Sequence, residues 1–375
     1  MEIESLDQLD ALLAGGSTLS GLRLQGLDLR GHEEALLART DVAGLVVLGG
    51  CLSPALEAHL RQGRAIIFPN DPDAPIDPYR ARLYHPDELY AGLAEHGYAA
   101  TPDAIAYAWS RDATLAHDAF VSTLRAIHDQ SMADALDELL EGRRVVGIMG
   151  GHAVERGSTA YAEAAVLASS LAEKGFVVAT GGGPGAMEAA NLGAFARDVD
   201  LLRGALTSLA VVPAFRPDVR AWAEVALKVR ARIARAPRAP GAPARSVGLP
   251  TWFYGHEPPN VFGDGIAKFF SNALREDGLL ARCNAGIAVL PGAAGTVQEI
   301  FQVITRLYYG GEGGVGDSGD GDIGPLPPLV LVGREHWTNA IPVWPAVQAL
   351  GVRRSMAGAV HLVNEPSEAV AILST

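Results

Sequence analysis

The chain has 375 residues, enough for two domains, and 49% of them are apolar, so it can bury a sizeable core. Its formal net charge of −13 argues against a nucleic-acid polymer as partner, because a long polyanion would be repelled. No apolar run approaches the ~20 residues that cross a bilayer, and the start Met1–Glu4 is acidic where a signal peptide would be basic. We therefore expect a cytoplasmic protein with no membrane partner.

The two cysteines, Cys51 and Cys283, belong to no motif with metal-ligand spacing, which fits a reducing compartment. Nothing else in the sequence suggests a metal-ligand set. We predict neither a metal nor a cofactor.

Residues 1–140 are expected to form an N-terminal α/β accessory domain. Gly44–Gly50 and Arg64–Phe68 are apolar runs of strand length, and Pro54–Gln62 between them has a helical pattern. From 101 to 141, apolar residues recur at three- and four-residue spacings, which predicts helix. Because the histidines of this part are scattered singly and form no catalytic constellation, we expect a regulatory or dimerisation role.

Residues 141–375 alternate strands with helices, which predicts an α/β fold with a doubly wound, mostly parallel sheet. Two segments rich in Pro, Gly or Ala interrupt the pattern, Ala236–Val247 and Gly310–Pro328, and both read as surface insertions. The second follows a candidate site, so a lid and a plain insertion are both open for it. The expected strands are Val145–Met149, Phe176–Ala179, Leu206–Val212, Ile287–Leu290 and Leu329–Val332; the expected helices are Ser158–Lys174, about 185–196, Phe262–Leu280, about 295–308 and about 337–350.

Two glycine-rich turns each follow an expected strand and open a helix. Without a Cβ the backbone can approach an anion closely, and the first amides of a helix point outward without partners. The carboxyl ends of parallel strands share one edge of the sheet, so both turns should lie together. They predict a phosphate site; a pair of tight turns without a ligand is the alternative. The turns comprise Gly181, Gly182, Gly183, Pro184, Gly185 and Met187, and then Pro291, Gly292, Ala293, Ala294, Gly295 and Thr296.

Neither turn fits the common nucleotide fingerprints. No Lys-Ser/Thr pair follows the glycines, so a P-loop is excluded. No acidic residue closes a second strand near the first turn, which disfavours a nicotinamide dehydrogenase.

The paired motif resembles a known family. Gly181-Gly182-Gly183 with Met187, followed by Pro291-Gly292-x-x-Gly295-Thr296-x-x-Glu299, looks like the LONELY GUY family of nucleoside-monophosphate phosphoribohydrolases, long mislabelled as lysine decarboxylases. The sequence Gly-Pro-Gly-Ala-Met-Glu-Ala is more similar to that of the bacterial pyrimidine/purine nucleotide 5′-monophosphate nucleosidases of the same superfamily. The resemblance covers about residues 143–365. It implies a Rossmann-like domain that hydrolyses the base–ribose bond of a nucleoside 5′-monophosphate, and a homodimer or higher homo-oligomer.

The resemblance also implies roles for individual residues. In the family the second turn binds phosphate, the glutamate acts at the ribose, and a preceding arginine is catalytic. Here these roles fall to Glu299 and to Arg275, which lies sixteen residues before Pro291 where the family has about fifteen. Arg282 is the fallback, and a surface salt bridge with Glu276 or Asp277 is the structural alternative for Arg275.

Two positions depart from the family pattern. Ala293 replaces the second glycine of the family's Pro-Gly-Gly, and Gly150-Gly151-His152 replaces Gly-Ser-Ser after the first strand. His152 could contact phosphate or base, or be structural or solvated.

The run Gly255–Asn260 is a polar turn in which His256 or Glu257 could face the ligand and Asn260 could cap a helix. Trp252, Phe253 and Tyr254 could stack on a base or end a strand.

In this interpretation Glu299 stabilises positive charge on the ribose and activates a water, while Arg275 fixes the pose of the substrate. A pyridoxal-phosphate decarboxylase is disfavoured because Lys174, Lys228 and Lys268 lie outside both turns. The rival of another class is a non-catalytic nucleotide sensor or carrier. Glu299 favours the enzyme, since a carboxylate beside the phosphate would only repel a carrier's ligand.

Overall fold

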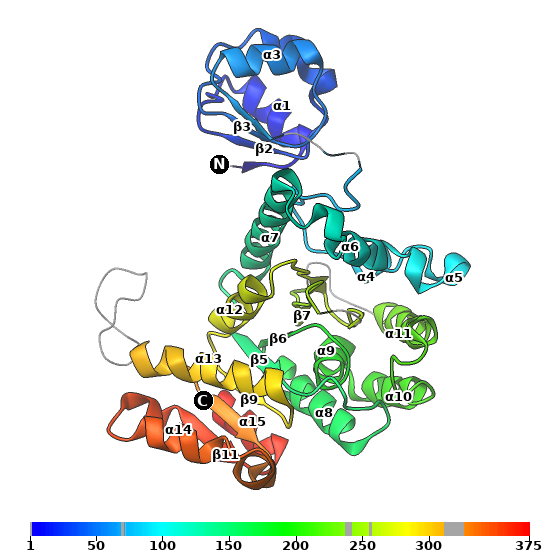
Figure 1. Ribbon diagram of the computed structural model, residues 1–375, viewed down its shortest axis with the longest axis vertical. Helices are drawn as coiled ribbons and strands as arrows, with labels where there is room; N and C mark the ends of the chain where they lie inside the picture. The colour runs from blue at the N-terminus through cyan, green and yellow to red at the C-terminus, as the bar shows by residue number, and fades with distance from the viewer. Residues whose placement is uncertain (1, 69–70, 72, 237–241, 255–256, 311–325) are drawn as a thin grey trace. The chain divides into compact units, whose positions relative to one another are not determined.

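The computed structural model describes residues 2–68, 71, 73–236, 242–254, 257–310 and 326–375. The chain forms two compact units, of which the first comprises Met1–Leu83 with Asp112–Ala135 and the second Tyr84–Arg111 with Leu136–Thr375 (Figure 1). The chain passes from the first unit to the second for the last time between Ala135 and Leu136, near the expected boundary at 140/141. Tyr84–Arg111, which we expected in the first domain, groups with the second unit instead.

The first unit contains a parallel sheet in which each strand neighbours the next one in sequence, in the order β1-β2-β3-β4. Its fully buried leucines, among them Leu9, Leu24 and Leu56, belong to one core. A sheet whose strand order does not reverse has no switch-point crevice, the usual ligand site of open α/β sheets. The elements that belong wholly to this unit are β1 (Glu2–Ile3), α1 (Leu6–Ala14), β2 (Arg23–Gln25), η1 (Leu29–His32), α2 (Glu33–Leu37), β3 (Val46–Leu48), α3 (Pro54–Gln62), β4 (Ile66–Phe68) and η3 (Ala113–Leu115), and α7 (Ala119–Leu140) begins in it.

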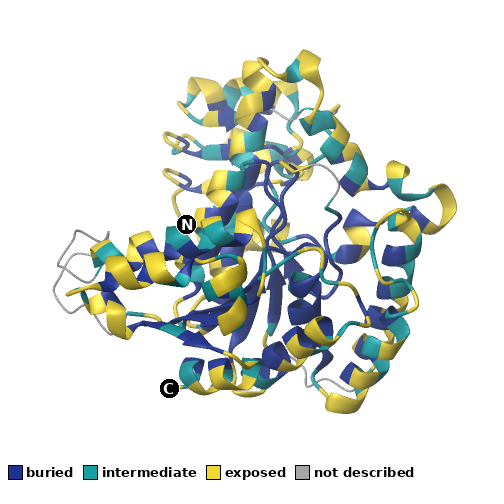
Figure 2. Ribbon diagram, turned by 60° about the horizontal axis from the view of Figure 1, so that its bottom comes forward, coloured by how far each residue is buried: buried dark blue, intermediate teal, exposed yellow. Residues whose placement is uncertain are grey.

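The second unit contains a parallel sheet in the order β11-β10-β9-β5-β6-β7-β8. From β5 the chain adds β6, β7 and β8 on one side and later adds β9, β10 and β11 on the other. Because crossovers are right-handed, this reversal distributes the helices over both faces. The buried strands and the exposed outer sides of the helices are visible in Figure 2. The doubly wound α/β fold is therefore confirmed, and its switch point lies between β5 and β9.

The second unit's strands are β5 (Val145–Met149), β6 (Val177–Thr180), β7 (Ser246–Gly248), β8 (Gly265–Ile266), β9 (Ile287–Val289), β10 (Leu329–Val332) and β11 (Val360–Val363). Its helices are α4 (Pro86–Leu89), α5 (Leu93–His96), η2 (Tyr98–Ala100), α6 (Pro102–Ser110), α8 (Thr159–Glu173), α9 (Ala186–Ala196), α10 (Val199–Leu209), α11 (Val219–Ala234), α12 (Asn272–Arg282), α13 (Ala294–Gly310), η4 (His336–Ala340), α14 (Trp344–Gly351), η5 (Ser355–Gly358) and α15 (Pro366–Leu373). None of the helices in the described ranges is long and apolar enough to span a membrane.

Several expected elements differ from the structure. The strand expected at Leu206–Val212 is wrong: its first half ends α10, whose buried Leu202, Ala205 and Leu209 recur at helical spacing. The neighbour of β6 is instead β7, which overlaps the end of the loop expected at Ala236–Val247. The single helix expected over Phe262–Leu280 is a short strand, β8, followed by α12. The expected insertions lie partly outside the described residues, at 237–241 and 311–325, so a lid there stays a prediction.

Helices α8 and α9 pack with their backbones in close contact. Every residue of α9 except Met187 is buried, and small residues occupy most of it. A Cβ added to Gly193 would lie 1.9 Å from the carbonyl oxygen of Ala165 on α8. Only glycine permits this approach, which holds α9 and the turn before it against α8.

Gly193→Ala is therefore expected to lower the free energy of unfolding by about 3 kcal/mol, because a backbone carbonyl cannot rotate away from the added methyl. Urea denaturation measures it. Gly358→Ala is the matched control, since a Cβ at Gly358 meets nothing within 4 Å. Equal stabilities of the two variants would show that α8 and α9 can separate at little cost.

A buried ion pair joins the loop after β5 to α9. Arg156 donates from Nε and Nη2 to the two carboxylate oxygens of Glu188, at 2.8 and 2.6 Å, and the side chains are 1% and 0% exposed. Tyr161 Oη donates to the same carboxylate at 2.9 Å, and Arg156 Nη1 donates to the carbonyl of Trp222 at 3.1 Å. Glu188, the glutamate of the Gly-Ala-Met-Glu motif, thus has a structural role.

A second buried network ties α6 to the strand region. The carboxylate of Asp103 on α6 accepts from Lys268 Nζ, from Trp252 Nε1 at 2.9 Å and from Tyr98 Oη at 2.7 Å. Lys268 is 1% exposed, and burial lowers its pKa although Asp103 opposes the shift. Three donors on one carboxylate compensate its loss of hydration. The segment Tyr84–Arg111 is thereby integral to the second unit.

Candidate functional site

A pocket of about 800 Å³ lies where β5, β6 and β9 end. Two of these strands, β5 and β9, flank the switch point of the sheet. Ligands of open α/β sheets bind at such a place, outside the carboxyl ends of the strands. The pocket therefore has the location that the sequence predicts for the phosphate turns.

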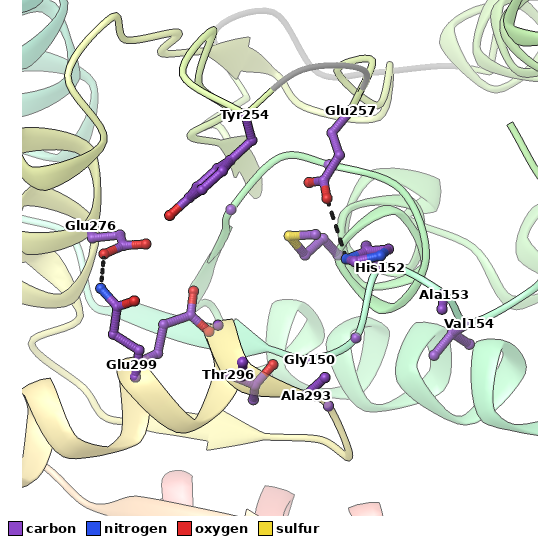
Figure 3. Close-up of a pocket in the computed structure, with 18 of the residues that line it drawn as sticks. Gly150, His152, Ala153, Val154, Tyr254, Glu257, Glu276, Ala293, Thr296 and Glu299 are labelled. Atoms are coloured by element: carbon purple, nitrogen blue, oxygen red, sulfur yellow. Dashed lines mark hydrogen bonds and ion pairs between the residues drawn. The ribbon is translucent and has the colours of Figure 1, made fainter. Parts of the chain in front are cut away.

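The structure brings almost all of the expected site residues to this one pocket (Figure 3). Gly182 and Gly185 do not line it, and Gly185 lines an adjoining cavity of about 400 Å³. The expected residues that line the main pocket are Gly150, Gly151, His152, Gly181, Gly183, Met187, Arg275, Pro291, Gly292, Ala293, Ala294, Gly295, Thr296 and Glu299.

Gly182 and Gly185 are needed for the chain's own packing. Gly185 has φ +73°, and a Cβ there would lie 2.5 Å from the carbonyl oxygen of Gly151. Gly182 has φ +70°, and its Cβ would lie 2.5 Å from Pro250. For these two positions the structural explanation is sufficient, because both the backbone conformation and the close approach require glycine.

Gly295 is different, because it lines the pocket and a Cβ there would meet nothing within 4 Å. We expect Gly295→Val to fold normally but to bind a phosphate-bearing ligand at least ~10-fold more weakly, since the side chain would occupy space beside the first amides of α13. Isothermal titration calorimetry and a thermal melt measure the two properties. Unchanged affinity in the folded variant would show that the ligand stays away from this turn.

Glu299 lies on the first turns of α13 and points into the pocket (Figure 3). Burial raises the pKa of its carboxyl to about 7; Arg275 counteracts this shift, and the neighbouring Glu276 and Glu257 add to it. A carboxyl that titrates near neutral pH can both accept and release a proton.

Arg275 is 7% exposed, on the buried side of α12. Its Nη2 donates to Asn272 Oδ1 at 2.7 Å and lies 3.3 Å from Glu276 Oε1, while its buried Nε has no hydrogen-bond partner. A Cβ on Gly181 would lie 3.4 Å from Nη1, so the guanidinium faces the first turn. The expected pair with Glu276 exists, but it is buried in the pocket wall. The fallback Arg282 pairs with Asp137 at 2.7 Å and does not line the pocket.

The sequence interpretation missed Glu276 as a pocket residue. Glu276 is 5% exposed, and its Oε2 accepts from Gln298 Nε2 on α13 at 2.6 Å. Its neighbours on the buried side of α12 are Arg275, Leu279 and Leu280. Two charged residues on the apolar stripe of an amphipathic helix are the signal that could have found it.

The polar turn after β7 also reaches the site. Glu257 lines the pocket, and its Oε1 lies 3.3 Å from His152 Nδ1 (Figure 3). His256 lies outside the described residues. Asn260, expected as a possible helix cap, instead donates to Gly183 O at 3.0 Å and so braces the first turn.

The three aromatic residues before that turn have different surroundings. Trp252 is buried in the Asp103 network, so it is not available to stack on a base. Phe253 is exposed, and Tyr254 lines the pocket with 45% of its surface exposed. Among the residues that the structure describes, no group of three or more His, Cys, Asp or Glu side chains could hold a metal ion.

Comparisons with known proteins cover part of the chain. Residues 143–202, which include the first turn, match the model of the SLOG cluster4 family. No curated protein matches the chain. The specific resemblance to the LONELY GUY family stays a prediction.

Similar solved structures include a molybdenum cofactor binding protein from the phototrophic bacterium Rippkaea orientalis, at 14% identity and a TM-score of 0.34, covering 62% of this chain and 96% of that one. Another is the molybdenum cofactor carrier protein MCP from Chlamydomonas reinhardtii, at 14% identity and a TM-score of 0.32, covering 61% and 94%. At this identity the likeness concerns the fold alone.

Proposed function

We propose that the pocket binds a nucleoside 5′-monophosphate and that Glu299 hydrolyses its base–ribose bond. The observation that carries this proposal is that Glu299 lines one pocket together with Arg275 and both glycine-rich turns; burial raises the pKa of its carboxyl to about 7. Helix N-termini and glycine turns suit the phosphate, and the carboxyl suits a reaction that develops positive charge on a sugar. The products are a free base and ribose 5-phosphate.

Each group has a defined part in this reaction. The turns hold the 5′-phosphate, a group that does not react, and so position the ribose. Arg275 has a buried Nε without a partner and an Nη1 directed at Gly181, which leaves it donors for phosphate or ribose. The ionised carboxylate of Glu299 stabilises the positive ribose and takes a proton from the attacking water.

A non-catalytic carrier or sensor that binds the same ligand is the second candidate. A carboxyl with a pKa of about 7 is neutral part of the time at neutral pH, so it repels a phosphate less than an ordinary carboxylate does. Glu299 is therefore compatible with a carrier as well as with an enzyme. The two similar solved structures are named for binding and carrying a molybdenum cofactor.

A base-release assay distinguishes the two candidates. The full-length protein is incubated with AMP, GMP, IMP, CMP and UMP and with the matching nucleosides, beside Glu299→Ala and the control Glu163→Ala, which changes an exposed residue of α8. Release from a monophosphate but not from its nucleoside, lost only in Glu299→Ala, is the expected result. Binding by calorimetry without release would support the carrier, and neither binding nor release would overturn both.

A further inference from the structure

The wall of the pocket opposite the second turn carries a phenol, Tyr254, whose ring reaches toward Glu299 (Figure 3). A chain of hydrogen bonds connects this phenol to Arg275. Arg275 Nη2 donates to Asn272 Oδ1 at 2.7 Å, and Asn272 Nδ2 donates to Tyr254 Oη at 2.9 Å. The amide of Asn272 thus bridges the guanidinium and the phenol.

The chemistry of the three groups fixes the direction of these bonds. A guanidinium has only donors, so the oxygen of Asn272 must face Arg275 and its NH₂ must face Tyr254. The phenolic oxygen is therefore the acceptor of this bond, and its own hydrogen is directed elsewhere. Burial, together with the charges of Glu276, Glu257 and Glu299, raises the pKa of Tyr254 despite Arg275, so the hydroxyl keeps its hydrogen at neutral pH.

The roles assigned so far include no side chain that donates a hydrogen bond to the departing base. When the bond between C1′ and the base nitrogen breaks, the base takes the electron pair and becomes negative. Glu299 accepts a proton from water in this step, and His152, which also lines the pocket, faces Glu257 at 3.3 Å. A neutral hydroxyl with a free hydrogen, set across the pocket from the phosphate turns, is suited to stabilise the departing base.

We propose that Tyr254, positioned by Asn272, donates a hydrogen bond to the departing base; this inference rests on the proposed hydrolysis. The C1′–N bond breaks, and the base leaves with the electron pair while hydrogen-bonded to the phenol. Water forms the new C1′–O bond and transfers a proton to Glu299. The base then takes a proton from solvent, and Glu299 returns its proton to solvent. Water is the only co-reactant, and no electron is gained or lost overall.

The test compares leaving groups that need this hydrogen bond with leaving groups that do not. The base leaves GMP as an anion, whereas 7-methyl-GMP and nicotinamide mononucleotide release neutral bases. For the ordinary nucleotides that wild type hydrolyses, we expect Tyr254→Phe to lower kcat about 10²-fold with KM nearly unchanged. For the two nucleotides with a cationic base, we expect it to lower kcat less than ~3-fold. Asn272→Ala is expected to show the same pattern with a smaller loss.

Tyr309→Phe is the matched control, because Tyr309 is 66% exposed and lies outside the pocket. A thermal melt checks folding, and we expect Tyr254→Phe to melt at the wild-type temperature because 45% of the Tyr254 surface is exposed. An equal loss for anionic and neutral leaving groups, no hydrolysis of the cationic nucleotides by wild type, or no loss at all would overturn the role of Tyr254 and leave the proposed function standing. Absence of base release from every nucleotide by wild type would overturn the proposed function itself.

Discussion

Glu299→Gln is expected to reduce kcat for base release about 10³-fold while the variant still binds the nucleotide. The amide keeps the size of the side chain but can neither accept the proton of the attacking water nor carry the negative charge that stabilises the ribose. In wild type the carboxyl must be ionised to act, so activity should rise with pH through about 7, the pKa of Glu299. A pH–rate profile and calorimetry check both parts, with Glu163→Gln as control.

The same pKa has a consequence for stability. The folded state holds the proton of Glu299 up to about pH 7, whereas the ordinary value is 4.5. Stability from this proton is thus present below pH 4.5 and is lost as the pH rises through 7. Glu299→Gln should be more stable than wild type by about 2 kcal/mol at pH 8, allowing for partial solvent access, and equal to it near pH 4.

Full base-release activity of Glu299→Gln, with a pH–rate profile unchanged from wild type, would remove Glu299 from the mechanism.

Glu188→Ala is expected to lower the free energy of unfolding by about 3–5 kcal/mol, because it leaves the buried guanidinium of Arg156 without its carboxylate. The pair is bidentate and almost fully buried, so neither solvent nor a surface side chain can replace it. Tyr161 would also lose its acceptor. Denaturant unfolding followed by tryptophan fluorescence measures the loss, and Trp222 reports locally because Arg156 lies 4.5 Å from the centre of its ring.

The exposed pair Arg203–Asp200 provides the control for this effect. Its atoms lie as close, at 2.7 Å, but its side chains are 73% and 78% exposed. Asp200→Ala should leave the free energy of unfolding nearly unchanged, because solvated ion pairs contribute little. If both variants lose the same small amount, the interior around Arg156 must admit water.

The parts of the fold that the sequence predicted are those fixed by local pattern. Val145–Met149 is a strand in the structure because a short apolar run between two arginines and two glycines suits a buried parallel strand. The family resemblance implied that Arg275 and Glu299 belong to one site, and both line the pocket. The strand β7 could not be found this way, because its three residues are held by β6 and by Asn191, whose Nδ2 donates to Ser246 Oγ at 2.9 Å.

Tertiary contacts explain the remaining omissions at the site. Glu276 became a pocket residue only because α12 packs against α13, where Gln298 meets it. The bridge of Asn272 between Arg275 and Tyr254 joins two segments whose meeting no local pattern encodes. Such pairings depend on how elements meet in space, which a single sequence does not show.

The route of the chain has a consequence for how this protein can be divided. It enters the second unit at Tyr84, returns to the first at Asp112 and leaves it again after Ala135. A fragment that starts at residue 141 therefore omits Asp103, and with it the partner of the buried Lys268. The two units are consequently not interchangeable modules. A gene fusion or an expression fragment that separates them at one point would leave the buried Lys268 of the pocket-bearing unit without its carboxylate partner.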